Sequence, residues 1–229
     1  MRAGLVRGWI LRLARRKRLR TPAGGLSYWH ERARRFGARA VLNIGHPAEH
    51  FDEVTSRQKA LLLPRLQHRL EGWEKIVLDL GCGPGRFTPD LARIVEGEAI
   101  GVDPIPSLLE LAPQASGVRY ERMDVAAIPL PAEHVDVAWI CLVLGGITDS
   151  STLDQTIREV DRVLRPRGLV FLVENTTESP NPRGSAYWHF RSVSEYRSLL
   201  YFAPLEHLGD YLDQGEQISI MAGRKAAND

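Results

Sequence analysis

The sequence predicts an α/β fold in which a doubly wound, seven-stranded, mostly parallel sheet ends in an antiparallel hairpin. Three observations predict it. From residue 76 onward, short apolar runs alternate with segments of helical periodicity, which is typical of a parallel sheet with helices on both faces. The first apolar run, residues 76–80, leads into a glycine cluster. Near the C-terminus, the runs 205–212 and 217–223 flank a polar turn, which indicates a hairpin.

The remaining elements follow from the local pattern of side chains. Residues 76–80 are mostly apolar, as in a buried parallel strand. In residues 87–95 the apolar side chains recur at helical spacing, and Pro89 falls in the first turn, where proline is tolerated. The breaker run 165–168 ends an amphipathic helix. Further strands are expected at residues 99–103, 119–124, 135–144 and 169–175, and further helices at 26–40, 55–70, 107–111 and 154–164.

Length and composition indicate one domain with a terminal extension. A chain of 229 residues, 44% hydrophobic and 25% charged, is long enough to bury a substantial core. We expect a basic extension and linker over residues 1–25, followed by a domain over residues 26–229 whose first helices lie within 26–72. The two cysteines, Cys82 and Cys141, suggest no disulfide framework, so we expect a reducing, cytoplasmic compartment.

The N-terminal extension concentrates the positive charge. Residues 1–20 hold eight Arg and Lys and no acidic residue, which leaves 22 basic against 28 acidic residues in the remainder. Leu5, Trp9 and Leu13 lie at helical spacing, a pattern typical of a basic helix on an anionic surface, here the inner membrane face. A solvated tail, a helix docked on the acidic body and a transit peptide are the alternatives. The acidic body makes a nucleic-acid partner unexpected.

The glycine cluster between the first strand and its helix indicates a ligand site. A strand-to-helix turn presents backbone N–H groups to a ligand, and side chains at Gly81, Gly83 and Gly85 would block that approach. The dinucleotide fingerprint G-x-G-x-x-G is not met, because Arg86 stands where its third glycine should be. Asp79, two residues before the first glycine, would repel a pyrophosphate and suits a cationic ligand.

The stretch from Asp79 to Gly85 resembles the first motif of the class I S-adenosylmethionine-dependent methyltransferases, of the small stand-alone bacterial type. The resemblance implies a Rossmann-like domain, N-terminal cap helices, S-adenosyl-L-methionine as cofactor, S-adenosyl-L-homocysteine as product, and no metal. Asp103, at the end of the second strand, would then accept hydrogen bonds from both ribose hydroxyls. The other cofactor residues so implied are Gly81, Cys82, Gly83, Pro104, Ile105, Asp124, Val125, Cys141 and Leu142.

Three of these implied contacts are specific. Ile105 would cover the adenine, and Asp124 with Val125 would meet its amino group. Arg32, one helical turn after Tyr28, is a candidate partner for the cofactor carboxylate, with a surface ion pair as the alternative. We therefore include Tyr28 and Arg32 among the expected cofactor-binding residues.

Methyl transfer is an in-line displacement at an activated methyl group, so holding the reactants collinear supplies much of the acceleration. A base is needed only where the acceptor must lose a proton. The candidate catalytic residues are His46, Glu174 and His189. Glu174 ends the fifth strand, where open α/β sheets bind substrates, and His189 stands among aromatic residues that would restrict water. For each histidine, a packed side chain with a hydrogen-bond partner is the alternative. The expected substrate-binding residues are Asn175, Tyr187, Trp188 and Tyr196.

The absence of two sequence motifs narrows the class of acceptor that we expect. The chain lacks the Asp/Asn-Pro-Pro-aromatic motif of nucleic-acid amino-methyltransferases, and Cys141 does not follow a proline, as a cytosine C5 nucleophile normally does. We expect an O or N acceptor on a small molecule, sugar or glycan, in secondary-metabolite or polysaccharide biosynthesis. A protein acceptor, or cofactor binding without catalysis, is the alternative. Residues 46–50 match the zinc pattern H-x-x-E-H, but Pro47 argues against the helix that this pattern needs.

Overall fold

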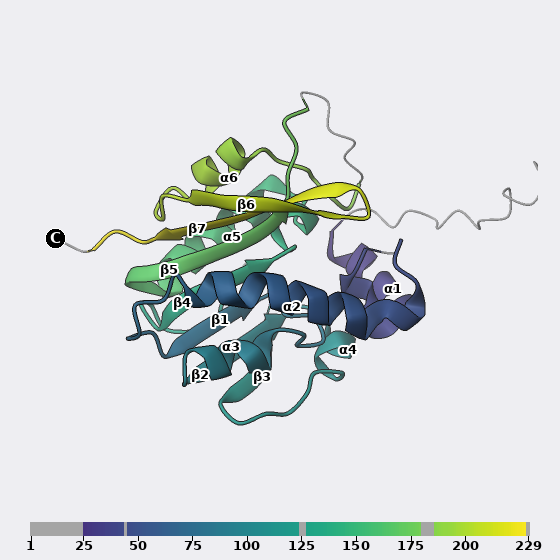
Figure 1. The fold of residues 1–229 in the computed structure, drawn as a ribbon, viewed down its shortest axis with the longest axis horizontal. Helices are drawn as coiled ribbons and strands as arrows, with labels where there is room; N and C mark the ends of the chain where they lie inside the picture. The colour runs from purple at the N-terminus through teal and green to yellow at the C-terminus, as the bar shows by residue number, and fades with distance from the viewer. Residues whose placement is uncertain (1–24, 44, 124–126, 180–185, 228–229) are drawn as a thin grey trace, which may run out of the picture.

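Residues 25–43, 45–123, 127–179 and 186–227 are described in the computed structural model of the protein. They form a seven-stranded sheet of order β3-β2-β1-β4-β5-β7-β6 (Figure 1). The first five strands in that order run parallel, and β7 pairs antiparallel with β5 and β6, so the expected fold is confirmed. The strands are β1 (Ile76–Leu80), β2 (Glu98–Asp103), β3 (Val118–Arg122), β4 (Val135–Cys141), β5 (Leu164–Asn175), β6 (Glu206–Asp213) and β7 (Glu216–Arg224).

Helices cover both faces of the sheet (Figure 1). Leu78 packs in a core with α5 and α6, whereas its neighbour Val77 packs in a second core with α2 and α3. Successive side chains of a strand point to opposite faces, so the apolar run of β1 fills both cores. The helices are α1 (Leu26–Phe36), α2 (Phe51–Gln67), α3 (Thr88–Ile94), α4 (Pro106–Leu109), α5 (Ser150–Val163) and α6 (Val193–Leu199), and the 3₁₀ turns are η1 (Gly37–Val41), η2 (Ala48–His50) and η3 (Leu144–Gly146).

The N-terminal helix lies at the carboxyl ends of the parallel strands (Figure 1). Ala33 of α1 and Ala40 of η1 share a small apolar cluster with Ile105 and Leu108, at the start of α4. The cap segment thus packs on the loop that follows β2. This arrangement places α1 beside the turns where a ligand site was expected.

Several boundaries differ from the sequence prediction: the helices predicted from residues 55 and 154 begin four residues earlier, at Phe51 and Ser150, and three further differences have a clear physical reason. The first helix ends at Phe36 instead of residue 40, because Gly37 adopts a positive φ of 54°. The strand predicted over residues 135–144 ends at Cys141, because Leu142 has a φ of 58°. The fifth strand begins at Leu164, five residues earlier than predicted, since Leu164 pairs with Val135 before a register shift in the ladder. The breaker run therefore lies inside β5 as an irregularity.

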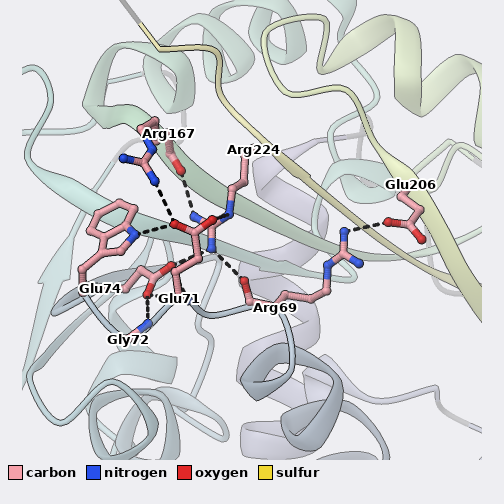
Figure 2. Close-up of polar contacts among 8 residues, drawn as sticks. Arg69, Glu71, Gly72, Glu74, Arg167, Glu206 and Arg224 are labelled. Carbon is pink, nitrogen blue, oxygen red and sulfur yellow. Dashed lines mark hydrogen bonds and ion pairs between the residues drawn. The ribbon is translucent and has the colours of Figure 1, made fainter.

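At the amino ends of β1 and β5, charged residues form a cluster that we call the amino-edge cluster (Figure 2). Its centre is Glu74, which is buried and accepts hydrogen bonds from the backbone N–H groups of Glu71 and Gly72 and from Arg224 at 2.7 Å. Arg224 also donates to the carbonyl oxygens of Arg69 and Arg167. The cluster, comprising these residues and Glu206, ties the segment before β1 to the end of β7 and the start of β5.

Some sequence predictions lie outside the described residues. Asp124 and Val125 are among them, as is the basic segment 1–20, so the adenine contact and the membrane-surface contact stay predictions. Within the described ranges, no helix is long and apolar enough to cross a membrane.

Candidate functional site

A cavity of about 1160 Å³ lies at the carboxyl ends of the parallel strands, where open α/β sheets bind their ligands. Its walls come from the glycine turn, the ends of β2, β4 and β5, the cap segment, and the β6–β7 turn. The cavity wall therefore contains a large part of the predicted site. The predicted residues on its wall are Arg32, Asp79, Gly81, Cys82, Asp103, Pro104, Ile105, Cys141, Leu142, Asn175, Tyr187 and Trp188.

The glycine turn has a different physical basis from the predicted one. Gly81 and Gly85 have φ values of 66° and 69°, in the left-handed region that favours glycine. A Cβ atom on Gly81 would lie 2.6 Å from Val143, and one on Gly85 would lie 2.5 Å from the hydroxyl of Tyr120. Gly81 lines the cavity, whereas Gly83 and Gly85 do not. The turn therefore needs its glycines for backbone conformation and close packing within the chain.

Asp103 ends β2 with its carboxylate on the cavity wall. Its Oδ2 accepts a hydrogen bond from the backbone N–H of Gly83 at 2.9 Å, and its Oδ1 accepts one from Ile105 at 2.8 Å. These bonds fix the orientation of the carboxylate and leave further lone pairs on both oxygens. Burial raises the pKa of Asp103 to about 6, against the lowering effect of the two backbone hydrogen bonds. A carboxylate fixed in this way can accept hydrogen bonds from two adjacent hydroxyls.

Asp79 lies at the end of β1, on the same cavity. Its Oδ2 accepts a hydrogen bond from the hydroxyl of Thr88 at 2.6 Å, and its side chain is buried. Burial raises the pKa of Asp79 to about 7, whereas Thr88 and the Arg86 guanidinium lower it. A carboxyl group in this state would become fully ionised when a cation binds beside it.

Arg86 follows the glycine turn and also lines the cavity. Its Nη1 donates to Oε1 of Gln58 at 2.7 Å and lies 3.4 Å from the hydroxyl of Thr55, both on α2. Burial lowers the pKa of the guanidinium. The sequence showed Arg86 only as a departure from the dinucleotide fingerprint.

Arg32, the predicted partner of the cofactor carboxylate, makes its contacts within the chain. Its Nε and Nη2 each lie 2.6 Å from a backbone carbonyl oxygen, of Ala40 and Leu42 respectively, and its Nη1 donates to the hydroxyl of Tyr28 at 2.8 Å. These bonds hold the end of the cap segment over the cavity. The alternative of a surface ion pair is not realised, and the cofactor role of Arg32 and Tyr28 stays a prediction.

Aromatic side chains join α1 to the segment before α6 over the cavity. The rings of Tyr28 and Tyr187 stack with centroids 4.0 Å apart, and Trp29 meets Trp188 edge to face at 6.2 Å. Gly145 and Gly146 of η3 lie directly beneath the two tryptophans: a Cβ on Gly145 would lie 2.5 Å from Trp188. Trp29, which the sequence analysis missed, lines the cavity with Tyr187 and Trp188.

Glu174 and Tyr196 lie in the core, away from the cavity wall. Glu174 is fully buried, and its carboxylate accepts hydrogen bonds from the backbone N–H groups of Val143 and Leu144 at 2.7 and 2.6 Å. Burial raises its pKa to about 7, against the effect of these bonds. The hydroxyl of Tyr196 lies 3.4 Å from Oε2 of Glu174. Glu174 therefore shapes the loop after β4, and neither side chain lines the cavity.

The two candidate histidines also lie off the cavity wall. His46 is buried, with Nε2 2.6 Å from Oδ1 of Asp213 and Nδ1 3.0 Å from the side-chain nitrogen of Gln214, so the alternative of a packed histidine is realised. The side chain of His189 is exposed, so the expectation that water access is restricted there is wrong. His50, the second histidine of the zinc pattern, is exposed as well. Among the residues that the structure describes, no group of His, Cys, Asp and Glu could hold a metal ion.

The structure adds two acidic residues that the sequence reading treated only as parts of a turn. Asp213 and Glu216 flank the β6–β7 turn, and both line the cavity, with the amide of Asn175 donating to Glu216 at 3.2 Å. Asp213 is buried by its contact with His46. No sequence signal could have found this contact, because the two residues are 167 positions apart.

These features fit a zwitterionic nucleoside such as S-adenosylmethionine. Two parallel strands end in buried carboxylates, Asp79 and Asp103, at one cavity, with a cation, Arg86, beside the first. Burial raises the pKa of both carboxyl groups, and neither forms an ion pair with a described residue. Ile105 adds an apolar wall next to Asp103. A ligand with hydroxyls, an apolar ring, an ammonium and a carboxylate would satisfy each of these groups.

Comparison with known proteins supports this assignment. A methyltransferase domain family matches residues 78–172. The malonyl-[acyl-carrier protein] O-methyltransferase of Legionella pneumophila is 27% identical over 72% of this chain, and the ubiquinone/menaquinone biosynthesis C-methyltransferase UbiE of Vibrio campbellii is 30% identical over 48%. The chain spans 58% and 45% of the length of these two relatives.

A solved structure shows the same fold. The PH0226 protein of Pyrococcus horikoshii superposes with a TM-score of 0.62 at 16% identity, over 85% of this chain and 99% of that one. The domain match covers the sheet from β1 to β5, which contains the glycine turn and Asp103. The fold, the domain match and the motif at the cavity agree: over residues 78–172 the chain is similar to the class I S-adenosylmethionine-dependent methyltransferases.

Proposed function

We propose that the protein transfers a methyl group from S-adenosylmethionine to a small-molecule acceptor. The observation that carries this proposal is the single cavity that joins Asp79 and Asp103, at the cofactor motifs, to a second wall of aromatic and polar side chains. A volume of about 1160 Å³ is large enough to hold a cofactor and an acceptor together.

The second wall supports a compact acceptor. Trp29, Tyr187, Trp188 and Phe190 contribute apolar surface, and Asn175 contributes a polar group among them. Small-molecule sites combine a mostly apolar lining with a few polar groups that fix orientation. We propose an O or N acceptor on a small molecule or sugar. The names of the two relatives add two acceptors to test: an oxygen of malonyl-[acyl-carrier protein], and a carbon of a compound in ubiquinone or menaquinone biosynthesis.

The chemistry we propose depends on positioning. The acceptor atom attacks the methyl carbon while the bond from that carbon to sulfur breaks, and the electron pair remains on sulfur. Glu174, His46 and His189 do not line the cavity, so the proposal assigns none of them as a base. The walls instead hold acceptor and methyl group in line, which supplies much of the acceleration for such a displacement.

The test is transfer of a labelled methyl group from S-adenosylmethionine to a panel of acceptors: hydroxylated aromatics, free and amino sugars, a quinol, a malonyl thioester and an unfolded protein. Label in one of the small molecules, with a higher KM for it in Trp188→Ala, supports the proposal. The matched control is Trp73→Ala, at the opposite edge of the sheet, where the KM should not change. Label only in protein, or cofactor binding with no transfer at all, would favour the protein-methylating or non-catalytic alternative.

A further inference from the structure

Arg86 carries a positive charge into the cavity wall without a carboxylate partner. Among the residues that the structure describes, its side-chain hydrogen bonds run only from Nη1 to two neutral side chains, Gln58 and Thr55. No described carboxylate forms an ion pair with the guanidinium. The side chain of Arg86 is partly buried, and its guanidinium lies 5.0 Å from the centroid of the Phe87 ring, which supplies no full negative charge. A ligand carboxylate would supply the missing charge.

The charges around Arg86 restrict which carboxylate that is. Asp79 lies on the cofactor side and Asp213 on the side of the β6–β7 turn, and both act on the guanidinium electrostatically. An acceptor carboxylate beside Asp213 and Glu216 would meet two like charges. On the cofactor side, an amino acid brings its own ammonium, which Asp79 can bind while Arg86 binds its carboxylate. The pair Asp79 and Arg86, at the two ends of one glycine turn, is thus complementary to an amino-acid zwitterion.

Arg32 is less suited to the same task. Each of its three guanidinium nitrogens already has an oxygen acceptor in the chain, two of them backbone carbonyl groups at 2.6 Å. Turning it toward a ligand would leave these carbonyl groups without that bond. Arg86, by contrast, has Nε and Nη2 without a hydrogen bond to any described residue.

We propose that Arg86 binds the carboxylate of the cofactor's amino-acid end, and that with Asp79 it selects the zwitterion. The inference rests on the proposed function, because it assumes S-adenosylmethionine as the ligand. It assigns to Arg86 the contact that the sequence analysis assigned to Arg32. Arg32 is then a positioning residue that holds the cap segment over the cavity.

The experiment compares two ligands that differ only at this end of the molecule. S-adenosylhomocysteine carries the amino-acid group, whereas 5′-methylthioadenosine keeps the nucleoside and lacks it. Calorimetry of Arg86→Met should show a loss of about tenfold to a hundredfold in affinity for S-adenosylhomocysteine, as expected for a hydrogen-bonded charge pair. Its affinity for 5′-methylthioadenosine should stay within about twofold, the scatter of a neutral site. Arg93→Met, an exposed arginine on α3, is the matched control and should change neither.

A second variant keeps the proposal testable if Arg86→Met does not fold. Gln58→Glu places a carboxylate 2.7 Å from Nη1 of Arg86, so it supplies an internal partner with little change of shape. We expect its melting temperature to be at least that of the wild type, with weaker binding of S-adenosylhomocysteine and unchanged binding of 5′-methylthioadenosine.

The outcomes separate the two proposals. If the wild type binds both ligands and neither variant weakens S-adenosylhomocysteine selectively, the assignment to Arg86 is wrong while the proposed function stands. If both variants weaken both ligands equally, Arg86 supports the fold of the site and binds no carboxylate. If the wild type binds neither ligand, the proposed function fails and the inference fails with it.

Discussion

The two edges of the sheet bury charge in opposite ways. At the amino ends, Glu74 is fully buried, yet the hydrogen bonds from Arg224 and from backbone N–H groups outweigh its burial, and its pKa is lowered. At the carboxyl ends, burial prevails over the available hydrogen bonds, and the pKa values of Asp79 and Asp103 rise to about 7 and about 6. At the amino edge, groups within the chain compensate the buried charge. At the carboxyl edge the buried carboxyl groups lack such partners, and a ligand can supply them.

This difference distinguishes residues that stabilise the fold from residues that bind a ligand, and it does not depend on similarity to other proteins. The amino-edge cluster connects four chain segments, and within it both carboxylate oxygens of Glu74 accept hydrogen bonds (Figure 2). The cavity edge instead combines Asp79, Asp103 and Arg86 around a space of about 1160 Å³, and each of the three has its hydrogen bonds to neutral groups. Substitutions at the first edge should therefore change stability, and substitutions at the second should change binding.

The largest effect is expected at the amino edge. Arg224→Met leaves Glu74 buried without its cation, so the free energy of unfolding should fall by about 3 kcal/mol or more. For a chain of this size that lowers the melting temperature by about 6–12 °C. Chemical denaturation and calorimetric melting measure both quantities. Near-wild-type stability would show that the backbone hydrogen bonds to Glu74 are sufficient, and the contrast between the edges would be lost.

At the cavity edge, Asp79→Asn should weaken binding and preserve the fold. The neutral form is already tolerated in the free protein, because the pKa of Asp79 is about 7. We expect the free energy of unfolding to stay within about 1 kcal/mol of the wild type, the usual range for a near-isosteric change. Affinity for S-adenosylhomocysteine should fall about tenfold, since a charged hydrogen bond is lost. A large loss of stability with unchanged affinity would make Asp79 a structural residue.

The pH dependence follows from the same two carboxyl groups. Between the unfolded pKa of 3.8 and the folded values of about 6 and about 7, the folded free protein binds more protons than the unfolded chain. Its stability should therefore fall as pH rises through this window, as far as these groups determine it. Binding of a cationic ligand requires the ionised forms, so affinity should rise over the same window, by about tenfold. Calorimetry at several pH values measures this change, and a weaker dependence in Asp79→Asn identifies the group.

The smallest effect sharpens the comparison within the amino edge. Arg69 and Glu206 form an ion pair at 2.7 Å in which both side chains are partly or largely exposed. Such pairs contribute at most about 1 kcal/mol, so Arg69→Met should lower the melting temperature by only about 2–4 °C. The measurement is the same melting experiment as for Arg224→Met. If Arg69→Met and Arg224→Met lowered the melting temperature equally, burial of an ion pair would not determine its contribution to stability.

Local sequence patterns predicted the fold and the cofactor half of the cavity. The apolar run of β1, the glycine turn and the acidic ends of β1 and β2 are all contiguous in the sequence, and Asp79 and Asp103 line one cavity as predicted. Boundaries failed where single residues adopt positive φ, at Gly37 and Leu142, because this depends on tertiary contacts that no periodicity shows.

The acceptor half was harder to predict because its contacts join distant segments. His46 forms a hydrogen bond with Asp213, 167 positions away in the sequence, and Arg86 donates one to Gln58 on the earlier helix α2. Glu174 carried a signal that was missed: it shares a side of β5 with Val170 and Leu172, and both pack in the core with α5 and α6. Strand alternation alone would have placed it in the core.

The central claim is that the carboxyl edge of the sheet is an S-adenosylmethionine site, and one titration tests it most directly. Calorimetry of S-adenosylhomocysteine into the wild type and into Asp103→Ala measures binding without requiring knowledge of the acceptor. We expect a Kd on the order of micromolar for the wild type, within the usual range for enzyme ligands, and loss of binding in the variant. No heat of binding to the folded wild type at ligand concentrations of about 1 mM, the upper end of that range, would contradict the account.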